Sequence, residues 1–180
     1  MKKLRFISMM CLLALFVVSL VGCKKEDVNS NGNNNNTENP GGGGTAAEYV
    51  DLGLPSGTKW KSTNETGGNN GFYTYDEAVN AFEDKLPTKE QMEELIDNCT
   101  WVWQNNGYKV SSSNGNSIIL PAAGFYNCEG AVYCVGSDGG YWSSTSIDSE
   151  KANSLYFYSN EKGVSSDFRC YGLSVRLVQK

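Results

Sequence analysis

Apolar and polar positions follow three different patterns along the chain. Residues 6–22, FISMMCLLALFVVSLVG, form a nearly unbroken apolar run, whereas residues 29–44, NSNGNNNNTENPGGGG, contain no aliphatic or aromatic side chain. The rest of the chain alternates short apolar runs with polar positions and turns. This division predicts a leader over residues 1–22, a linker over 23–45 and one folded domain over 46–180.

Two segments near the start of this domain have the pattern of amphipathic helices. TYDE and TKEQ each place a threonine three residues before Glu or Gln, the spacing of a capping box: Thr74 with Glu77, and Thr88 with Gln91. Behind the second cap, apolar residues recur at helical spacing in one stripe: Met92, Leu95, Ile96 and Cys99. The acidic residues of the first turns suit the positive end of the helix dipole, so we interpret them as caps and surface charge.

The period of the pattern changes from helical to two at Trp101. Short runs rich in β-branched and aromatic residues follow, separated by turns such as SNGN, CEG, SDGG and NEKG: TWVWQ, YKVSS, SIILPAAGFY, AVYCVG, GYWSST, SLYFYS, KGVSSDF and LSVRLV. An earlier alternating run, VDLGL at residues 50–54, predicts a first strand, and we expect Trp60 to anchor the chain behind it. Helices followed by local hairpins indicate an α+β domain with two short helices and a twisted antiparallel sheet.

The leader resembles a bacterial lipoprotein signal. Lys2, Lys3 and Arg5 precede the apolar run, which is short for a membrane span and ends in LVGC. This ending is similar to a lipobox, which implies that Cys23 becomes the acylated first residue of the mature chain; an ordinary signal peptide cut near Gly22, or an uncleaved anchor, is the alternative. The following CKKED is similar to the export signals that send lipoproteins of Bacteroidetes to the cell surface. We expect an outer-membrane protein held by a lipid anchor, on the surface or on the periplasmic side.

The linker is expected to be a flexible tether. It cannot bury enough apolar surface to offset the entropy lost on ordering. About twenty glycine-rich residues span roughly 25 Å on average, which holds the domain away from the membrane.

Composition excludes several classes of function. The chain has no histidine, which removes the commonest general base and the commonest transition-metal ligand. In the domain, 17 Asp and Glu outnumber 10 Lys and Arg, and this acidic charge disfavours binding to nucleic acid. No GxGxxG fingerprint and no phosphate-binding loop occurs. We expect a non-enzymatic protein without catalytic residues, cofactor or metal.

Six blocks of the domain carry a family resemblance. In order they are YVDLGLPSGTKW, LPTKEQMEELIDNCTW, GYKV, NGNSIILPAAG, GGYWSST and CYGLSVRLV. They resemble the Fibrobacter succinogenes major paralogous domain, and the match covers nearly all of residues 48–179. The resemblance implies a C-type-lectin-like fold, which formylglycine-generating enzymes share, in a surface lipoprotein of Bacteroidetes. It implies no activity, because the function of that family is not generally established.

The block GGYWSSTS, residues 139–146, is interpreted as architecture, with ligand contact as the alternative. Gly139 and Gly140 allow positive φ and close backbone approach. In a strand, Tyr141 points to one face and Trp142 to the other. A buried tryptophan packs in a core and hydrogen-bonds its N–H group.

Arg176 stands between two apolar residues in the last predicted strand. We expect it to be a paired structural charge, with Asp51 of the first strand as its partner. Contact between Arg176 and a ligand is the other interpretation.

Four cysteines fall in the domain: Cys99, Cys128, Cys134 and Cys170. In an oxidising compartment they allow three disulfide connectivities. A local bridge between Cys128 and Cys134 across EGAVY is our prediction. A buried free thiol is equally reasonable for Cys99, which lies on the helix stripe.

The most plausible activity is binding, because aromatic side chains stack on sugars and make rigid contacts with proteins. We expect an unknown glycan or protein ligand to contact Tyr156 and Tyr158 of SLYFYS and Asn153 of the loop before it, with Tyr141 and Trp142 as further candidates. If Leu155 and Phe157 face the core, the two tyrosines merely cover a sheet. The alternative function is a structural subunit of a pilus-like surface assembly.

The resemblance to lectins raises the question of calcium. No EPN, QPD or WND ligand pattern occurs in the domain, and the acidic residues of its strand-rich half are scattered. We therefore expect any ligand to bind without calcium, through aromatic and amide side chains.

Overall fold

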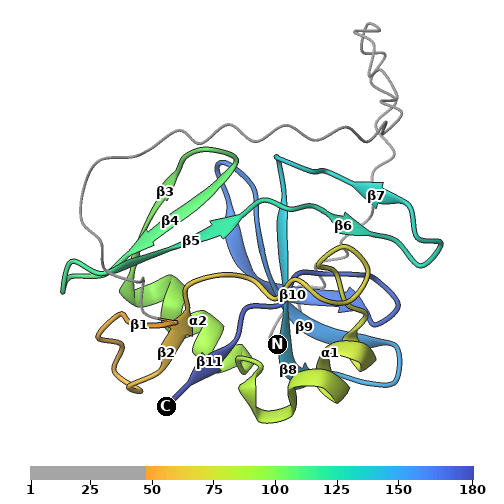
Figure 1. Ribbon diagram of the computed structural model, residues 1–180, viewed down its shortest axis with the longest axis horizontal. Coiled ribbons are helices and arrows are strands. Elements are labelled where there is room, and N and C mark those ends of the chain that lie inside the picture. The colour runs from red at the N-terminus through yellow and green to blue at the C-terminus, as the bar shows by residue number, and fades with distance from the viewer. Residues whose placement is uncertain (1–47) are drawn as a thin grey trace, which may run out of the picture. The chain divides into compact units, whose positions relative to one another are not determined.

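The computed structural model describes residues 48–180, so Cys23 and the predicted leader and tether lie outside the described residues. Two helices and a 3-10 turn precede most of the strands (Figure 1). These elements are α1 (Tyr75–Phe82), η1 (Glu83–Lys85) and α2 (Lys89–Asn98). The predicted α+β class with two helices and antiparallel strands is confirmed. No helix in residues 48–180 is long and apolar enough to cross a membrane.

The described strands are divided among several small antiparallel sheets, where the sequence predicted one. The three-stranded sheets are β1 (Tyr49–Asp51), β2 (Lys59–Lys61) and β11 (Val178–Gln179); β3 (Thr100–Trp103), β4 (Gly107–Ser111) and β5 (Ser117–Pro121); and β8 (Gly139–Ser146), β9 (Lys151–Phe157) and β10 (Lys162–Phe168). A two-stranded hairpin, β6 (Phe125–Tyr126) and β7 (Val132–Tyr133), lies between them in sequence. The strands stop early because residues with positive φ interrupt them, such as Gly124 before β6 (φ 78°) and Cys134 after β7 (φ 58°).

Both predicted capping boxes are present. The Thr74 and Thr88 hydroxyls accept from the backbone N–H of Glu77 and Gln91, and those two side chains accept from the threonine N–H groups. Met92 and Leu95 are buried, as the stripe predicted. The helix itself ends at Asn98, and Cys99 already has an extended backbone.

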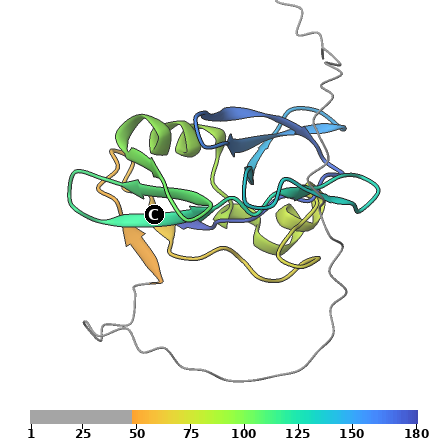
Figure 2. The ribbon, with the colours of Figure 1, turned by 90° about the horizontal axis from the view of Figure 1, so that it is seen from above.

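The sheet β8–β9–β10 has a hydrophobic core on each face. Tyr141, Leu155 and Phe157 share one core with α2, whose axis runs beside this sheet (Figure 2). Trp142 belongs to the other core, which contains α1 residues. The pattern of alternation in GGYWSSTS therefore matches the structure. Neither Gly139 nor Gly140 has positive φ; Gly139 is needed because a Cβ there would overlap the Phe157 ring.

The first predicted strand is shorter than expected. β1 ends at Asp51, whose carboxylate accepts from the Gly53 N–H at 2.8 Å, and Gly53 turns the chain with φ 63°. Leu52 and Leu54 are nevertheless buried, in the loop that follows. Trp60 is buried in β2, as predicted.

Arg176 is buried, but the predicted pair with Asp51 is wrong. The guanidinium donates to the Asn64 side-chain oxygen at 2.8 Å and to the carbonyls of Lys61, Ser62 and Ile119 at 2.7–3.0 Å. Backbone acceptors therefore take the place of a carboxylate, and burial lowers the pKa of Arg176. With 1% of its surface exposed, Arg176 has no access to a ligand.

Candidate functional site

Tyr141 and Trp142 are structural residues, and the prediction that they contact a ligand is wrong. Their exposed fractions are 1% and 0%. The Tyr141 hydroxyl donates to the Pro121 carbonyl at 2.7 Å, and the Trp142 indole donates to the Tyr73 carbonyl at 2.7 Å. Burial raises the pKa of Tyr141 to about 12. The interpretation of the block GGYWSSTS as architecture therefore holds for Tyr141 and Trp142, whereas Gly139 and Gly140 of the same block line a cleft.

Asn153 is not brought together with the two predicted tyrosines of β9. Its side-chain amide donates to the Thr145 carbonyl at 3.0 Å, beside the irregular end of β8. Side chains alternate across a strand, so Asn153 shares a face with Leu155 and Phe157, while Tyr156 and Tyr158 have the opposite face. The predicted ligand residues therefore do not form one site.

Tyr156 and Tyr158 line a cleft of about 110 Å³. Leu155 and Phe157 are buried, as we expected if the tyrosines only cover a sheet, but here the tyrosines meet a second wall. That wall comes from segments distant in sequence, and the remaining lining residues are Phe125, Asp138, Gly139, Gly140, Asp167, Tyr171 and Leu173.

Two pairs of aromatic rings line this cleft. Phe125 and Tyr171 stack with their ring centroids 5.8 Å apart and an interplanar angle of 23°. In the other pair, the Tyr156 and Tyr158 rings are 5.7 Å apart and inclined at 51°. Tyr156 lies over Gly163 of the neighbouring strand, where a larger residue would meet its ring. The absence of a side chain at Gly163 therefore leaves space for the Tyr156 ring, near the end of the central strand of the sheet.

Carboxylates surround the aromatic rings. Asp138 and Asp167 line the cleft, and the Tyr156 hydroxyl donates to the Glu161 carboxylate at 2.9 Å. The Ser154 hydroxyl donates to one oxygen of Asp167. Burial, and then the charges of Asp138, Glu161 and Asp167, raise the pKa of Tyr158, which keeps its hydroxyl protonated. No lysine or arginine is among the residues that line the cleft.

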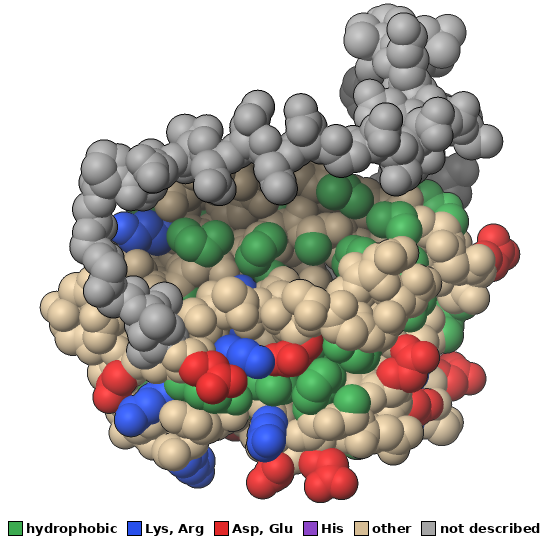
Figure 3. Space-filling view, viewed as in Figure 1, with side chains coloured by type: hydrophobic (Ala, Val, Ile, Leu, Met, Phe, Trp, Pro, Cys, Tyr) green, Lys and Arg blue, Asp and Glu red, His purple; other side chains and the backbone are tan. Residues whose placement is uncertain are grey.

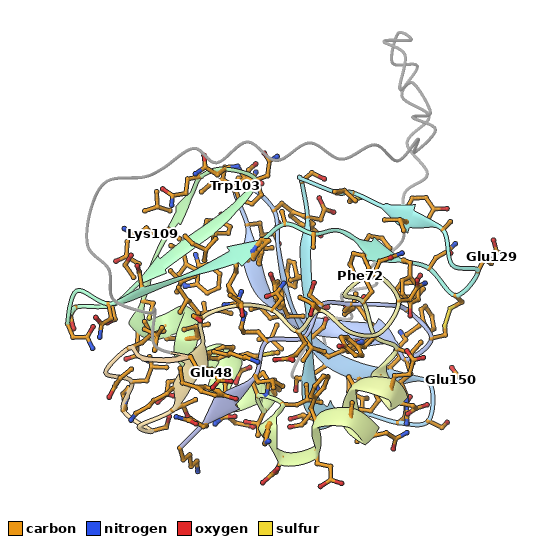
Figure 4. The ribbon with its side chains drawn as sticks, viewed as in Figure 1. Glu48, Phe72, Trp103, Lys109, Glu129 and Glu150 are labelled. Carbon is orange, nitrogen blue, oxygen red and sulfur yellow. A yellow bond between two sulfur atoms is a disulfide. The ribbon has the colours of Figure 1, made fainter. Side chains whose placement is uncertain are left out.

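A disulfide holds the Phe125–Tyr171 wall, and it is not the one predicted. Cys128 in the β6–β7 loop is bonded to Cys170 after β10, with a Cα–Cα distance of 5.0 Å; Figure 4 shows the bond below Glu129. Cys134 is an exposed free thiol. Cys99 is a half-buried free thiol, and a free thiol was one of the two possibilities that the sequence left open for it. The predicted Cys128–Cys134 bond is wrong because of register. Phe125 faces Tyr133, so Cys134 falls opposite Gly124 at one end of the hairpin, whereas Cys128 lies in the turn at its other end.

Exposed apolar side chains border the same hairpin. Val132, Tyr133 and Val135 are 53%, 47% and 70% exposed. Hydrophobic side chains gather over β5, β6 and β7 on the face shown in Figure 3. The Tyr133 ring lies 5.8 Å from the Phe125 ring, so this exposed apolar group adjoins the cleft.

Two other features of the described residues are weaker candidates. A larger hollow, about 730 Å³, lies beside the start of α2, but Thr88 and Gln91 in its wall already satisfy each other in the helix cap. No group of three or more acidic, histidine or cysteine side chains in residues 48–180 is arranged to hold a metal ion.

Comparison with known proteins gives a family without an assigned activity. Residues 87–178 match the family described as Domain of unknown function (DUF8237), over half of the chain. The chain belongs to the DUF8237 family. No curated protein and no solved structure matches it. The DUF8237 segment runs from just before α2 into β11 and contains every residue that lines the aromatic cleft.

Proposed function

We propose that this DUF8237 protein is a non-enzymatic binding module whose ligand contacts the cleft between Tyr156–Tyr158 and Phe125–Tyr171. The observation that carries the proposal is that one cleft is lined by the half-buried Tyr156, the exposed Tyr158, the Phe125–Tyr171 pair beside the disulfide, and two carboxylates. Rigid aromatic rings supply contact area at little cost in side-chain entropy, and carboxylates orient hydrogen-bond donors. A glycan or a protein ligand fits this description.

The location of the module is part of the proposal. The lipobox-like LVGC and the Asn/Gly-rich stretch after it support a lipid anchor at Cys23 and a tether, with the domain displayed from the outer membrane. The six blocks that resemble the Fibrobacter succinogenes major paralogous domain support a C-type-lectin-like arrangement of the two helices and the strands.

A second function has one observation in its favour. The exposed Val132, Tyr133 and Val135 offer an apolar surface of the kind that subunits bury when they assemble. A structural role in a cell-surface assembly would use this surface, with or without the cleft beside it.

The proposal is tested with the full chain on a glycan array and on a panel of outer-membrane proteins. Tyr158→Ser removes a cleft wall, and Val102→Ser is the matched control, because Val102 is 52% exposed on β3 and does not line the cleft. We expect ligands that bind the wild type and the control to bind Tyr158→Ser at least tenfold more weakly. Equal binding by all three proteins would show that the cleft is not the contact site.

A further inference from the structure

We propose that the cleft binds the cationic side chain of a partner protein, an arginine in preference to a lysine. This inference rests on the proposed function and specifies its ligand. The two carboxylates that line the cleft accept hydrogen bonds and donate none when ionised. Guanidinium and ammonium groups donate and cannot accept, so they complement such a site.

The hydrogen bonds already present in the cleft sharpen this complementarity. The Tyr156 hydroxyl already donates a hydrogen bond to the Glu161 carboxylate, and the Ser154 hydroxyl already donates one to the Asp167 carboxylate. The lining residues include no amide side chain, lysine or arginine that would donate to a ligand. The Tyr158 and Tyr171 hydroxyls can still donate, but a neutral sugar does not compensate the negative charge of the two lining carboxylates, whereas a cation does.

The aromatic walls suit a planar cation. Three cations of the protein already lie over aromatic rings: Arg169 over Tyr75 at 4.8 Å, Lys151 over Phe168 at 4.9 Å and Lys162 over Trp101 at 5.7 Å. None of these contacts involves a ring that lines the cleft. A guanidinium stacks on aromatic faces and pairs with carboxylates at its edge, which favours arginine.

The size and the surroundings of the cleft favour a protein as the source of that cation. Pockets for drug-sized ligands measure roughly 300–1,000 Å³. A cleft of about 110 Å³ takes a group the size of one side chain. Val132, Tyr133 and Val135 beside it offer apolar area to the surface around that side chain, in the manner of an interface in which one anchor enters a pocket.

The test compares two peptides that differ in one group, a guanidinium that is cationic and only donates, against a neutral urea group with a carbonyl acceptor. Calorimetry with the full chain in detergent uses acetyl-Gly-Arg-Gly-amide and the same peptide with citrulline, which is neutral and nearly isosteric with arginine. We expect the arginine peptide to bind at least tenfold more tightly, and added salt to reduce the difference. Equal affinities, or no binding of the arginine peptide at millimolar concentration, would overturn the inference.

Matched charge variants place the effect in the cleft. Asp167→Asn removes a cleft carboxylate and keeps its shape, while Asp97→Asn removes an exposed carboxylate of α2, which does not line the cleft. We expect Asp167→Asn to weaken the arginine peptide about tenfold and Asp97→Asn to leave it unchanged. Equal losses in both variants would mean that the peptide responds only to overall acidity, which contradicts the inference.

Other ligands separate this inference from the proposed function. If a neutral hexose binds and Tyr158→Ser abolishes its binding while the arginine peptide fails, the cleft is a binding site but the cation inference is wrong. If calcium alone binds at micromolar concentration and Asp167→Asn abolishes it, the carboxylates serve a metal ion, which also overturns the inference. If every ligand found on the array and panel binds Tyr158→Ser as it binds the wild type, the proposed function itself fails.

Discussion

Two pairs of aromatic residues lie on neighbouring strands of the same sheet and have opposite environments. Tyr141 and Trp142 of β8 are wholly buried, one in each core, and their polar atoms bond to backbone carbonyls. Tyr156 and Tyr158, at the end of β9, share one face and line an open cleft. The pairs differ in sequence spacing, consecutive in β8 and alternate in β9, and this spacing decides whether a pair spans the sheet or lines one side of it.

The comparison shows why aromatic content alone is a poor guide to a binding site. β8 is covered on both faces, so its aromatic side chains hold the two cores together. At the end of β9, Gly140 and Gly163 stand beside Tyr156 on either neighbouring strand. Leu173 packs over Gly140 and the Tyr156 ring packs over Gly163, so Tyr156 is half-buried while Tyr158 remains exposed.

The largest expected difference between the pairs is in stability. Trp142→Ala removes a fully buried ring that also donates to Tyr73, and it should lower the free energy of unfolding by about 3–5 kcal/mol. Tyr158→Ala removes a ring that is 41% exposed, and it should change the same free energy by about 0.5 kcal/mol or less. Urea denaturation of the two variants measures both values. Similar losses would mean that the exposed pair is part of the core.

The Cys128–Cys170 disulfide, which lies beside the cleft, should contribute to the free energy of unfolding. It joins residues separated by 42 positions, and loop entropy gives it about 3–4 kcal/mol of stabilisation. Replacing Cys128 and Cys170 together by serine should therefore lower the free energy of unfolding by that amount, whereas Cys134→Ser should leave it unchanged. Denaturation with and without reductant measures the effect. Peptide mapping that finds Cys128 bonded to Cys134 would contradict the structure.

The smallest expected effect is the loss of stability at alkaline pH that the buried Tyr141 causes. The pKa of Tyr141 rises from 10.0 in the unfolded chain to about 12 in the fold, because its neutral form is favoured by burial. The stabilisation is complete below pH 10 and is lost as pH rises through 12, which corresponds to about 2–3 kcal/mol. Tyr141→Phe should remove this part of the alkaline destabilisation, and Tyr158→Phe, on an exposed ring, should remove less. Denaturation at pH 9 and above measures the slopes; equal slopes in the wild type and Tyr141→Phe would contradict the prediction.

The features that the sequence determined by itself are local ones. Thr74 with Glu77, and Thr88 with Gln91, cap helices because a capping box needs only residues within one turn. The run KGVSSDF was predicted to be a strand, and β10 covers the same residues. The opposite faces of Tyr141 and Trp142 follow from the alternation of side chains along a strand. In each case the interaction or the geometry involves only a few neighbouring residues, so a short stretch of the sequence is enough to recognise it.

Other features were decided by tertiary structure, because they depend on residues far apart in the chain. Alternation predicts that Tyr141 and Trp142 face opposite sides of their strand, but only the strand register places Tyr156 on the face opposite to Tyr141, and only the packing of α2 and of the segment around Tyr73 determines what covers each face. Cys128 bonds to Cys170 because two loops meet in space, while strand register carries the nearer Cys134 away. Three of the four acceptors of Arg176 are backbone carbonyls, which every residue has, and the fourth is the side chain of the distant Asn64, so the residues around Arg176 do not indicate its acceptors. For the same reason the sequence predicted only part of the cleft. Tyr156 and Tyr158 could be recognised as candidates because they lie in one short run. The other lining residues come from distant parts of the chain and meet these tyrosines only in the folded protein, among them Phe125, Asp138 and Tyr171.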